Sequence, residues 1–490
     1  MREIECDILI AGSGYSGCLM ALLLHQMDYK VAVVESSRHP RFAIGESSTP
    51  IADMILRTFA ENYELDWLHD LSRYGSWQSR YPEISCGIKR GFSYFNQTKN
   101  NHFDPGKQHH NELLVAASSS NSNSDTNWFR SDFDHFLVKK LKEAGITYFD
   151  LTHITQCERS HNSWKYTANQ KDKRIQFQCH LFLDATGSGT LSESLFGVGN
   201  TNESFSTSTR ATFGHFQGVK SWSEKLSELK VPSEDYPYDP DLSANHLVLN
   251  DGWLWLLRFN NGITSAGLVQ TSGDNSKSPA TSWQKMLDLY PDIADLFSDA
   301  RLISQAKSLR HTGRIQRRLS TCHGKAWVAL PNTAGFVDPL HSTGIAHSLS
   351  GIEKLANLLS EPNILQNKSV LQKKLTRYEN SIFTEIHFID QLTAGCYEAL
   401  PDFRLFTLWS MLYFTASVLY EQKRLAGNPP YHFLFANNKE LSKIVTYLLK
   451  DLRNLKIEFG DFIPEERLTQ FRQKIKIAIE PYNKAGLLHP

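Results

Sequence analysis

The sequence has no excess of charge of either sign. Lysine plus arginine and aspartate plus glutamate both number 52 among 490 residues. A chain that binds nucleic acid or an acidic membrane surface usually carries a clear positive excess, so this balance argues against both partners. Any electrostatic site is therefore expected to be local.

Paired cysteines and long apolar runs are also missing. The seven cysteines are odd in number and never fall in C-x-x-C spacing, which argues against a disulfide framework or a zinc site. His109 and His110 lack a third ligand at a recognisable spacing, so no metal is predicted. The apolar stretch 405–420 is shorter than the roughly 20 residues of a membrane span and predicts a buried helix. No basic and apolar leader follows Met1, so we expect a cytoplasmic protein.

A strand-turn-helix-strand pattern opens the chain. Residues 6–12 predict a buried strand, residues 17–27 a helix and residues 30–35 a second strand. Three glycines between the first strand and the helix have G-x-G-x-x-G spacing, and a glutamate ends the second strand. Such glycines let the backbone approach a pyrophosphate at the helix N-terminus, while the glutamate accepts from a ribose hydroxyl. The predicted dinucleotide-binding residues are Gly12, Ser13, Gly14, Tyr15, Ser16, Gly17, Glu35 and Ser36. The alternative is a purely structural turn.

Later segments extend this pattern in a recognisable order. R-x-x-F-D begins at Arg130, D-A-T-G at Asp184, and G-F-V-D-P contains Asp338. With G-x-G-x-x-G, this order resembles that of the FAD-binding monooxygenase-like superfamily. The resemblance implies FAD as cofactor and a fold in which the second acid approaches the ribityl chain and the next helix start faces the flavin. It assigns cofactor binding to Arg130, Asp184, Gly187, Asp338, Gly344 and Ile345. Taken alone, Arg130 also fits a surface salt bridge and Asp338 a helix cap.

Three further segments resemble the flavin-dependent halogenases, the tryptophan-halogenase-like family. I-G-E-S-S-T-P (44–50) resembles the family's strap over the flavin and implies cofactor contacts from Gly45, Glu46, Ser47 and Ser48. C-G-I-K-R-G-F-S-Y-F resembles the K-x-G-x-x-F segment of phenol- and pyrrole-acting members, and puts Lys89 at the family's essential lysine. G-W-L-W-L-L-R-F resembles W-x-W-x-I-P through Trp253 and Trp255, which would line the passage from flavin to substrate.

These resemblances cover residues 1 to about 360 and are incomplete. Leu257 and Arg258 stand where the family has Ile-Pro. The two tryptophans also fit a packed core, since residues two apart on a strand share a face. Lys89 also fits an ordinary strand lysine beside a turn.

The predicted fold class is α/β, with a Rossmann-like FAD-binding domain of the GR2 or p-hydroxybenzoate hydroxylase type, an inserted antiparallel sheet and a helical C-terminal region. A β-rich pattern around 205–300, with a turn at Asn260, Asn261 and Gly262, supports the insertion. The predicted boundaries are 1–83, 104–204 and 305–362 for the FAD-binding domain, 84–103 and 205–304 for the β-rich substrate region, and 363–490 for the helical region.

The resemblance implies an enzyme that uses FADH2, O2 and a halide, chloride or bromide, to make hypohalous acid. Lys89 would orient this acid as an ammonium or trap it as a haloamine, and a neutral amine requires a pKa lowered by burial, with Arg90 acting in the same direction. The halide would bind the backbone N–H groups of Thr343 and Gly344, because a turn that opens a helix is an anion site. Because the sequence shows one nucleotide-binding fold and no second one for a reductant such as NADH, we expect a separate flavin reductase to supply FADH2.

His341, in D-P-L-H-S-T-G, departs from the tryptophan-acting members, which carry glutamate there. A histidine either exchanges a proton near neutral pH or only packs against the flavin, and the residues leave both open. Two interpretations compete with a halogenase: a non-halogenating FAD-dependent monooxygenase or dehydrogenase, and a flavin-binding redox sensor without turnover. A serine hydrolase is disfavoured because G-x-S-x-G is missing. The substrate, expected to be electron-rich (aromatic, phenolic or pyrrolic), is a small free molecule or a carrier-tethered one.

Overall fold

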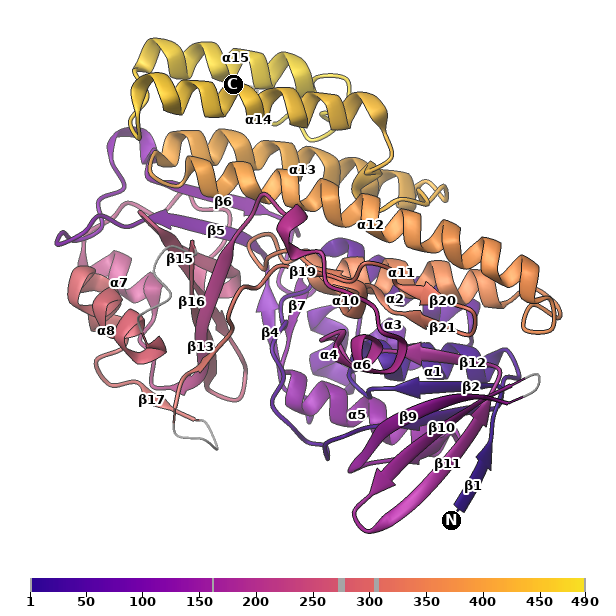
Figure 1. The fold of residues 1–490 in the computed structure, drawn as a ribbon. Helices are drawn as coiled ribbons and strands as arrows, with labels where there is room; N and C mark the ends of the chain where they lie inside the picture. The colour runs from indigo at the N-terminus through magenta and orange to yellow at the C-terminus, as the bar shows by residue number, and fades with distance from the viewer. Residues whose placement is uncertain (1, 161–162, 272–277, 304–307, 489–490) are drawn as a thin grey trace.

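A largely parallel six-stranded sheet organises the N-terminal part of the protein (Figure 1). The structure is a computed structural model and describes residues 2–160, 163–271, 278–303 and 308–488. The strand order is β20-β21-β12-β2-β3-β8, and β20 pairs antiparallel with β21 while the other neighbours run parallel. The strands are β2 (Ile8–Ala11), β3 (Val31–Val34), β8 (Thr147–Phe149), β12 (Leu181–Asp184), β20 (His323–Gly324) and β21 (Trp327–Ala329). The α/β class and the Rossmann-like arrangement predicted from the sequence are confirmed.

The first strand and helix approach each other closely because two glycines separate them. A Cβ atom on Gly17 would lie 2.0 Å from the carbonyl oxygen of Gly12, and Gly12 itself has φ +100°. Helix α1 (Tyr15–Gln26) therefore starts directly over the end of β2. Helices α5 (Arg130–Glu143) and α11 (Thr343–Leu359) pack beside α1. The predicted strand-turn-helix-strand unit is present as expected.

A second, mixed sheet builds the other half of the molecule in Figure 1. Its order is β17-β13-β16-β15-β14-β5-β6, with β18 paired to β13. The turn between β15 and β16 contains Asn260 and Gly262, as predicted, and Gly262 has φ +76°. The strands are β5 (Gly91–Asn96), β6 (Glu112–Ala116), β13 (Thr209–Gln217), β14 (Ala244–Leu249), β15 (Gly252–Arg258), β16 (Ile263–Thr271), β17 (Arg301–Leu302) and β18 (Arg310–His311).

One face of this second sheet carries a separate apolar core. Phe216 stacks on Trp283, and Phe95 meets Trp222 edge-on, so short helices seal that face. These helices are α7 (Trp222–Glu228), α8 (Pro279–Leu289) and α9 (Pro291–Leu296). The remaining face is left to the large core and the candidate site.

Smaller elements complete the fold. The strands are β1 (Arg2–Glu5), β9 (Thr152–Ser160), β10 (Ser163–Gln170) and β11 (Lys173–Cys179) in a four-stranded sheet, and the pairs β4 (Cys86–Lys89) with β7 (Asp125–Trp128) and β19 (Arg317–Arg318) with β22 (Gly335–Phe336). The helices are α2 (Pro50–Asn62), α3 (Asp66–Asp70), α4 (Tyr74–Arg80), α6 (Thr190–Phe196) and α10 (Pro331–Ala334).

The C-terminal region is helical, as predicted. It contains α12 (Lys368–Ala399), α13 (Phe403–Leu425), the 3-10 turn η4 (Phe433–Phe435), α14 (Lys439–Phe459) and α15 (Glu465–Ile479). Figure 1 shows α12 and α13 crossing above both halves of the molecule. The apolar stretch 405–420 lies inside α13 and is mostly buried. Among the described residues, no helix combines the length and apolar character that crossing a membrane requires.

A buried charged cluster joins this region to α11. The Glu385 carboxylate of α12 accepts hydrogen bonds from Lys354 and from the backbone N–H of Phe433, and pairs with His347 Nε2 at 3.1 Å. Burial raises the pKa of Glu385, but Lys354 and His347 outweigh it and lower that pKa to about 2. The cluster therefore holds α11, α12 and η4 together through one carboxylate.

Replacing this carboxylate tests its contribution. We expect Glu385→Gln to lower the free energy of unfolding by about 3–5 kcal/mol at pH 7, because it leaves Lys354 buried without an anion. The Glu385 pKa is lowered on folding, so its contribution is present above pH 4.5 and is lost as the pH falls toward 2. Denaturant unfolding at several pH values measures this. A wild-type to variant difference that stays constant from pH 7 to pH 3 would contradict the assignment.

Candidate active site

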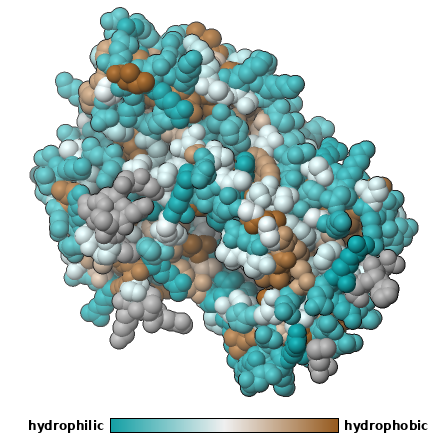
Figure 2. Space-filling model, viewed as in Figure 1, coloured by the Kyte–Doolittle hydropathy of each residue, from teal (hydrophilic) through white to brown (hydrophobic). Residues whose placement is uncertain are grey.

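A cavity of about 1020 Å³ lies between the two halves of the molecule. Ligand pockets usually measure about 300–1,000 Å³, so this one suits a large, elongated ligand. Figure 2 shows the surface hollowed near the middle of this view, with apolar residues inside the hollow and polar ones around it. Its wall includes many of the predicted site residues: Gly12, Gly14, Tyr15, Ser16, Glu35, Ser36, Gly45, Glu46, Ser47, Arg130, Gly187, Trp253, Trp255, Gly344 and Ile345.

The other predicted site residues lie behind this wall. They are Ser13, Gly17, Ser48, Lys89, Asp184, Asp338, His341 and Thr343. All of them except Lys89 are next in sequence to a residue that lines the cavity, whereas no residue of β4 lines it. Their roles in binding or catalysis stay predictions.

The start of α1 brings two guanidinium groups, each paired with a carboxylate, to one end of the cavity. Its N-cap, Gly14, supplies no side-chain hydrogen bond to the helix. A Cβ atom on Gly14 would lie 3.5 Å from Nη2 of Arg130 and 3.8 Å from Nη2 of Arg41. A helix N-terminus flanked by two guanidinium groups attracts and hydrogen-bonds anions such as a pyrophosphate.

Arg130 is held in place from both sides. Its Nε and Nη2 atoms donate to the two oxygens of Asp134, each at 2.8 Å, and Nη1 donates to the carbonyl oxygen of Gly45 at 3.0 Å. The Arg130 side chain is 8% exposed, so the pair is a buried one and not a surface salt bridge. Burial lowers the pKa of Arg130, but Asp134 outweighs it and raises that pKa, which keeps the guanidinium charged.

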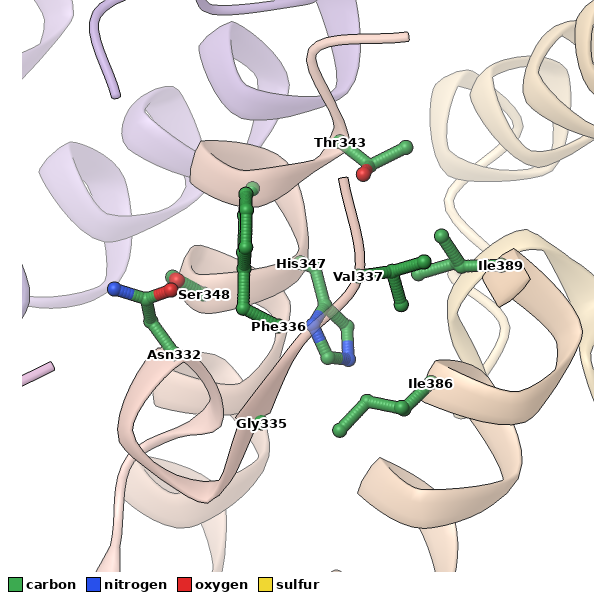
Figure 3. Close-up of a pocket in the computed structure, with 10 residues that line it drawn as sticks. Asn332, Gly335, Phe336, Val337, Thr343, His347, Ser348, Ile386 and Ile389 are labelled. Atoms are coloured by element: carbon green, nitrogen blue, oxygen red, sulfur yellow. The ribbon is translucent and has the colours of Figure 1, made fainter. Parts of the chain in front are cut away.

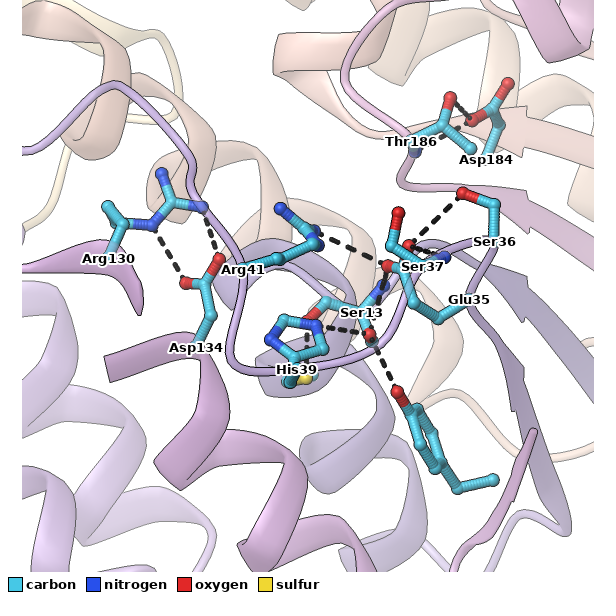
Figure 4. Close-up of polar contacts among 12 residues, drawn as sticks. Ser13, Glu35, Ser36, Ser37, His39, Arg41, Arg130, Asp134, Asp184 and Thr186 are labelled. Atoms are coloured by element: carbon cyan, nitrogen blue, oxygen red, sulfur yellow. Dashed lines mark hydrogen bonds and ion pairs between the residues drawn. The ribbon is translucent and has the colours of Figure 1, made fainter. Parts of the chain in front are cut away.

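Glu35 directly follows β3 and organises the loop before α1 (Figure 4). Its Oε2 atom accepts from the backbone N–H of Ser13 at 2.9 Å and from the Ser13 hydroxyl at 3.0 Å, and Oε1 accepts from the N–H of Ser37 at 2.9 Å. Burial raises the Glu35 pKa, but Arg41 and these hydrogen bonds lower it overall. The carboxylate is therefore ionised and rigid on the cavity wall, where an acceptor for ribose hydroxyls is expected.

Asp184 and Asp338 accept hydrogen bonds that stabilise the turns around the cavity. Asp184 accepts from the hydroxyls of Thr186 and Ser192, each at 2.6 Å, and so closes the turn after β12. Asp338 accepts from the Thr209 hydroxyl at 2.8 Å and from the Tyr397 hydroxyl at 2.9 Å. Burial raises the pKa of Asp338 to about 7. Both carboxyl groups thus bond to the protein and position the backbone that faces the cavity.

Residues 44–48, called the strap below, run along the cavity and pair with β7. The carbonyl of Glu46 accepts from the N–H of Trp128 at 2.6 Å, and the N–H of Ser48 donates to Thr126 at 3.2 Å. The Glu46 side chain is buried and meets Nε2 of His215 at 2.8 Å, while its Oε2 atom has no described partner. The strap is therefore a fixed strand-like segment.

Lys89 lies just beneath the strap, at the end of β4. Its ammonium donates to the carbonyl oxygen of Ser48 at 2.5 Å and sits 4.0 Å from the centre of the Phe92 ring. The side chain is 0% exposed, and burial lowers its pKa to about 7 against the opposing effect of nearby carboxylates. The expected help from Arg90 is absent, because that side chain bonds to Ser118 and Asn121. Burial alone therefore lowers the pKa of Lys89 far enough for its neutral form to be populated near pH 7.

Trp253 and Trp255 form the cavity wall on the second sheet. Their ring centres lie 6.0 Å apart on one face of β15. Trp253 Nε1 donates to the Tyr397 hydroxyl at 2.8 Å, and Trp255 Nε1 donates to the Ser265 hydroxyl at 3.2 Å. The ring of Trp255 lies against Gly267, where any Cβ atom would meet it. Both indoles are thus anchored and shape the cavity.

His341 is packed behind the cavity. Its ring stacks on Tyr413 at 4.3 Å, Nδ1 meets the Tyr94 hydroxyl at 3.3 Å, and Nε2 meets Cys396 Sγ at 3.4 Å. Burial lowers the pKa of His341 to about 3, so it is neutral near pH 7. This environment favours the packing role over the acid/base role.

The start of α11 borders two cavities. Its N-cap Ser342 is left-handed, with φ 53°, and gives no side-chain cap to the first turn. Gly344 faces the large cavity and also, with Thr343, a small one of about 10 Å³, roughly one water-sized sphere. Figure 3 shows this small cavity between α11 and α12, with Ile386 and Ile389 on its far side. The first-turn N–H groups here have the donor chemistry of an anion site.

Some residues on the cavity wall had no signal in the sequence. Arg317 donates to the carbonyls of Gly187 and Asn332, and its Nε atom is buried without a described partner. His246 lies between Tyr94 and Trp253. Arg41 sits in the short connection that precedes the strap. None of them belongs to a spaced motif, so only the fold brings them to the cavity.

The residues present fit FAD. The glycine-rich turn, the two guanidinium groups at the start of α1 and the ionised Glu35 match the pyrophosphate and adenosine ribose of a dinucleotide. Arg317 and Glu46, which also line the cavity, each keep one buried polar atom without a hydrogen-bond partner among the described residues.

Known proteins agree with this geometry. The tryptophan halogenase family model matches residues 127–400, more than half of the chain. Monodechloroaminopyrrolnitrin halogenase PrnC of Pseudomonas fluorescens is 26% identical over 432 residues, which cover 84% of this chain and 71% of PrnC. Tetracycline 7-halogenase of Kitasatospora aureofaciens is 23% identical over 71% of this chain and 62% of its own length.

Two further similar proteins are a brominase whose name gives a carrier-bound substrate and a halogenase of known crystal structure. The 1H-pyrrole-2-carbonyl-[peptidyl-carrier protein] brominase of Pseudoalteromonas luteoviolacea (strain 2ta16) is 24% identical over 70% of this chain and 74% of its own. The crystal structure of halogenase PltM superposes with a TM-score of 0.82 at 22% identity, over 97% of this chain and 96% of PltM. This chain belongs to the tryptophan halogenase family, and it is an FAD-dependent enzyme.

Proposed function

We propose that this protein is a flavin-dependent halogenase that acts on an electron-rich carbon, aromatic, phenolic or pyrrolic. The observation that carries the proposal is the buried Lys89, which bonds to the strap beside the cofactor cavity. Bound FADH2, with O2 and chloride or bromide, supplies hypohalous acid. Such a reactive species is useful only if a placed group meets it before it diffuses away, and Lys89 occupies that position.

In this proposal, different residues of the protein bind the cofactor, bind the halide and transfer the halogen. Arg41, Arg130 and Glu35 hold the cofactor, the α11 start at Thr343 and Gly344 holds the halide, and the indoles of Trp253 and Trp255 separate the cavity from the space around Lys89. Lys89 hydrogen-bonds the hypohalous acid or, as a neutral amine, accepts its halogen. Near pH 7 both forms are populated, because the pKa of Lys89 is about 7.

We also propose the partners that this chemistry requires. A separate flavin reductase delivers FADH2, since one dinucleotide site is present in the described residues. The named activity of one relative on a carrier-bound pyrrole supports a substrate that is either free or tethered to a carrier. The cytoplasmic location stays a prediction from the sequence.

FAD binding depends on the close approach at Gly17. We expect Gly17→Ala to weaken FAD binding about tenfold or more, because its Cβ would lie 2.0 Å from the Gly12 carbonyl oxygen and push α1 away from its anion-binding position. Quenching of flavin fluorescence during titration of the apoprotein measures the affinity. Gly313→Ala is the control, since nothing lies within 4 Å of its Cβ. Equal affinities of the two variants would contradict the predicted site.

Lys89 is expected to carry halogen transfer. With chemically reduced FAD, O2 and bromide, we expect the wild type to brominate a phenol, and Lys89→Ala to lose ring bromination by about 100-fold or more while it still consumes FADH2. Mass spectrometry of the phenol and the absorbance of the flavin measure the two steps. The exposed Lys99→Ala is the control.

Two outcomes would count against this proposal. A wild-type enzyme that oxidises FADH2 but never brominates the phenol or monochlorodimedone would favour a non-halogenating monooxygenase or dehydrogenase. Unchanged ring bromination in Lys89→Ala would remove the lysine from the mechanism.

The halide site can be tested directly. In crystals soaked with bromide, we expect anomalous density beside the backbone N–H groups of Thr343 and Gly344, because these amides open α11 without a side-chain cap. Anomalous diffraction at the bromine edge measures it. Bromide found at other places but missing here would contradict the assignment.

A further inference from the structure

Two buried carboxyl groups lie next to Lys89 and have no part in the site described so far. Lys89 on β4 is paired directly with Asp125 on β7, so their side chains project from the same face of this two-stranded ladder. Asp125 is 3% exposed, and so is Asp53, which lies in the first turn of α2. Buried acids are rare unless they are paired, so this pair of acids needs an explanation.

The strap connects these groups to one another. The Ser48 carbonyl accepts from Lys89 at 2.5 Å, and the Ser48 hydroxyl donates to Asp53 Oδ1 at 3.4 Å. The chain enters α2 at Pro50, two residues after Ser48, which brings Asp53 back toward the lysine. The lysine and the acid are therefore held by the same residue.

The carboxyl groups of Asp53 and Asp125 lie close enough to share a hydrogen bond, and each affects the pKa of the other. Two carboxyl groups can share a hydrogen bond only if one of them keeps its proton. Burial raises the pKa of Asp53 well above its ordinary value, and raises that of Asp125 to about 6. Asp53 is therefore the protonated donor, and Asp125 is the carboxylate that accepts from it.

Lys89 and Asp125 both have hydrogen-bonding capacity to spare. An ammonium has three donors, and the carbonyl of Ser48 takes one. Asp125 Oδ2 has no partner among the described residues. Within that part of the chain, no ion pair shorter than 4.0 Å locks Lys89 to a carboxylate. The lysine is thus influenced by Asp125 without being fixed as its ion-pair partner, which leaves it free to lose its proton.

The other titratable groups nearby leave Asp125 as the anion that faces the lysine. Burial lowers the pKa of His246 on β14 to about 3, and raises that of Glu421 on α13 to about 8, so both are mainly neutral at pH 7. Burial also raises the pKa of Tyr413 on α13. Arg57 on α2 is charged and lies beside Asp53 and Asp125, with Nη1 donating to the Ser72 hydroxyl at 3.3 Å.

We propose that Asp53 and Asp125 are positioning residues for Lys89: Asp53, as a neutral acid, donates the hydrogen bond that keeps Asp125 ionised, and Asp125 in turn sets the charge of Lys89. This inference rests on the proposed function, because it explains how one lysine is kept ready both to orient and to accept a halogen near neutral pH. Only protons move: Lys89 gains or loses one, and Asp125 holds the compensating charge.

The amide variants separate the two roles. We expect Asp125→Asn to lower the titration midpoint of Lys89 by about one pH unit or more, since the opposing anion is lost. Asp53→Asn is expected to leave the midpoint near its wild-type value, because an amide N–H donates to Asp125 as the protonated acid does. Asp53→Ala removes this donor, so Asp125 takes up a proton and the midpoint falls as in Asp125→Asn.

The midpoint is measured by NMR of enzyme labelled with 13C at the lysine Cε position, with FAD bound and no halide or O2. An exposed lysine titrates near pH 10.4, roughly, so the titration midpoint of Lys89 is well separated from those of the other lysines. The NMR signal of Lys89 is identified by its loss in Lys89→Arg. Asp292→Asn, a buried carboxylate on α9 beside the separate core, is the control and should not shift the midpoint. Thermal melting checks that each variant folds.

The outcomes are distinct from those of the halogenation assay. An unchanged midpoint in Asp125→Asn, or equal midpoints in Asp53→Asn and Asp53→Ala, would overturn the inference. If Asp125→Asn fails to fold, the comparison of the two Asp53 variants decides the question. Shifted midpoints in an enzyme that never halogenates would reject the proposed function and retain the role of the acid pair.

Discussion

The pairing of the strap with β7 is the contact on which the site depends. One edge of β7 holds the strap through the bonds from Trp128 to Glu46 and from Ser48 to Thr126, and the other edge holds β4 with Lys89 at its end. A single strand thus sets the separation between the cofactor cavity and the lysine. Arg130 lies two residues after the end of β7 and donates a hydrogen bond to the carbonyl of Gly45. The position of β7 therefore also fixes the guanidinium group at the predicted pyrophosphate end of the cavity. Hydrogen-bonded strands hold these groups at fixed separations, whereas a flexible loop would let the separations vary.

Burial determines the chemical state of the groups around this strand. Lys89, His246 and His341 are all shifted toward their neutral forms, since each would otherwise hold a charge out of contact with water. Asp338 and Asp53 are shifted toward their protonated forms for the same reason. Arg130 stays charged because Asp134 pairs with it.

Some of the site was predictable because it obeys short-range rules. The glycine spacing and Glu35 identify the cofactor end, since a tight turn before a helix has strict backbone requirements. Asp338 was recognised, but its contacts were not: its carboxylate bonds to Tyr397, on a helix for which the sequence offered no match. The acids beside Lys89 carried no motif, because Asp53 and Asp125 are 72 residues apart and meet only through α2 and β7. Arg90 illustrates the opposite case, a neighbour in sequence whose side chain points elsewhere.

The sequence by itself determined the elements, the dinucleotide turn, the likeness to halogenases and the chemical types of the site residues. These follow from local periodicity, from glycines with restricted geometry and from segments a few residues long. The tertiary structure decided which side chains face the cavity, which carboxyl groups are satisfied by the protein and which protonation states burial imposes. Those properties depend on contacts between residues far apart in the chain and on exclusion of water, and neither is encoded in any one stretch of sequence.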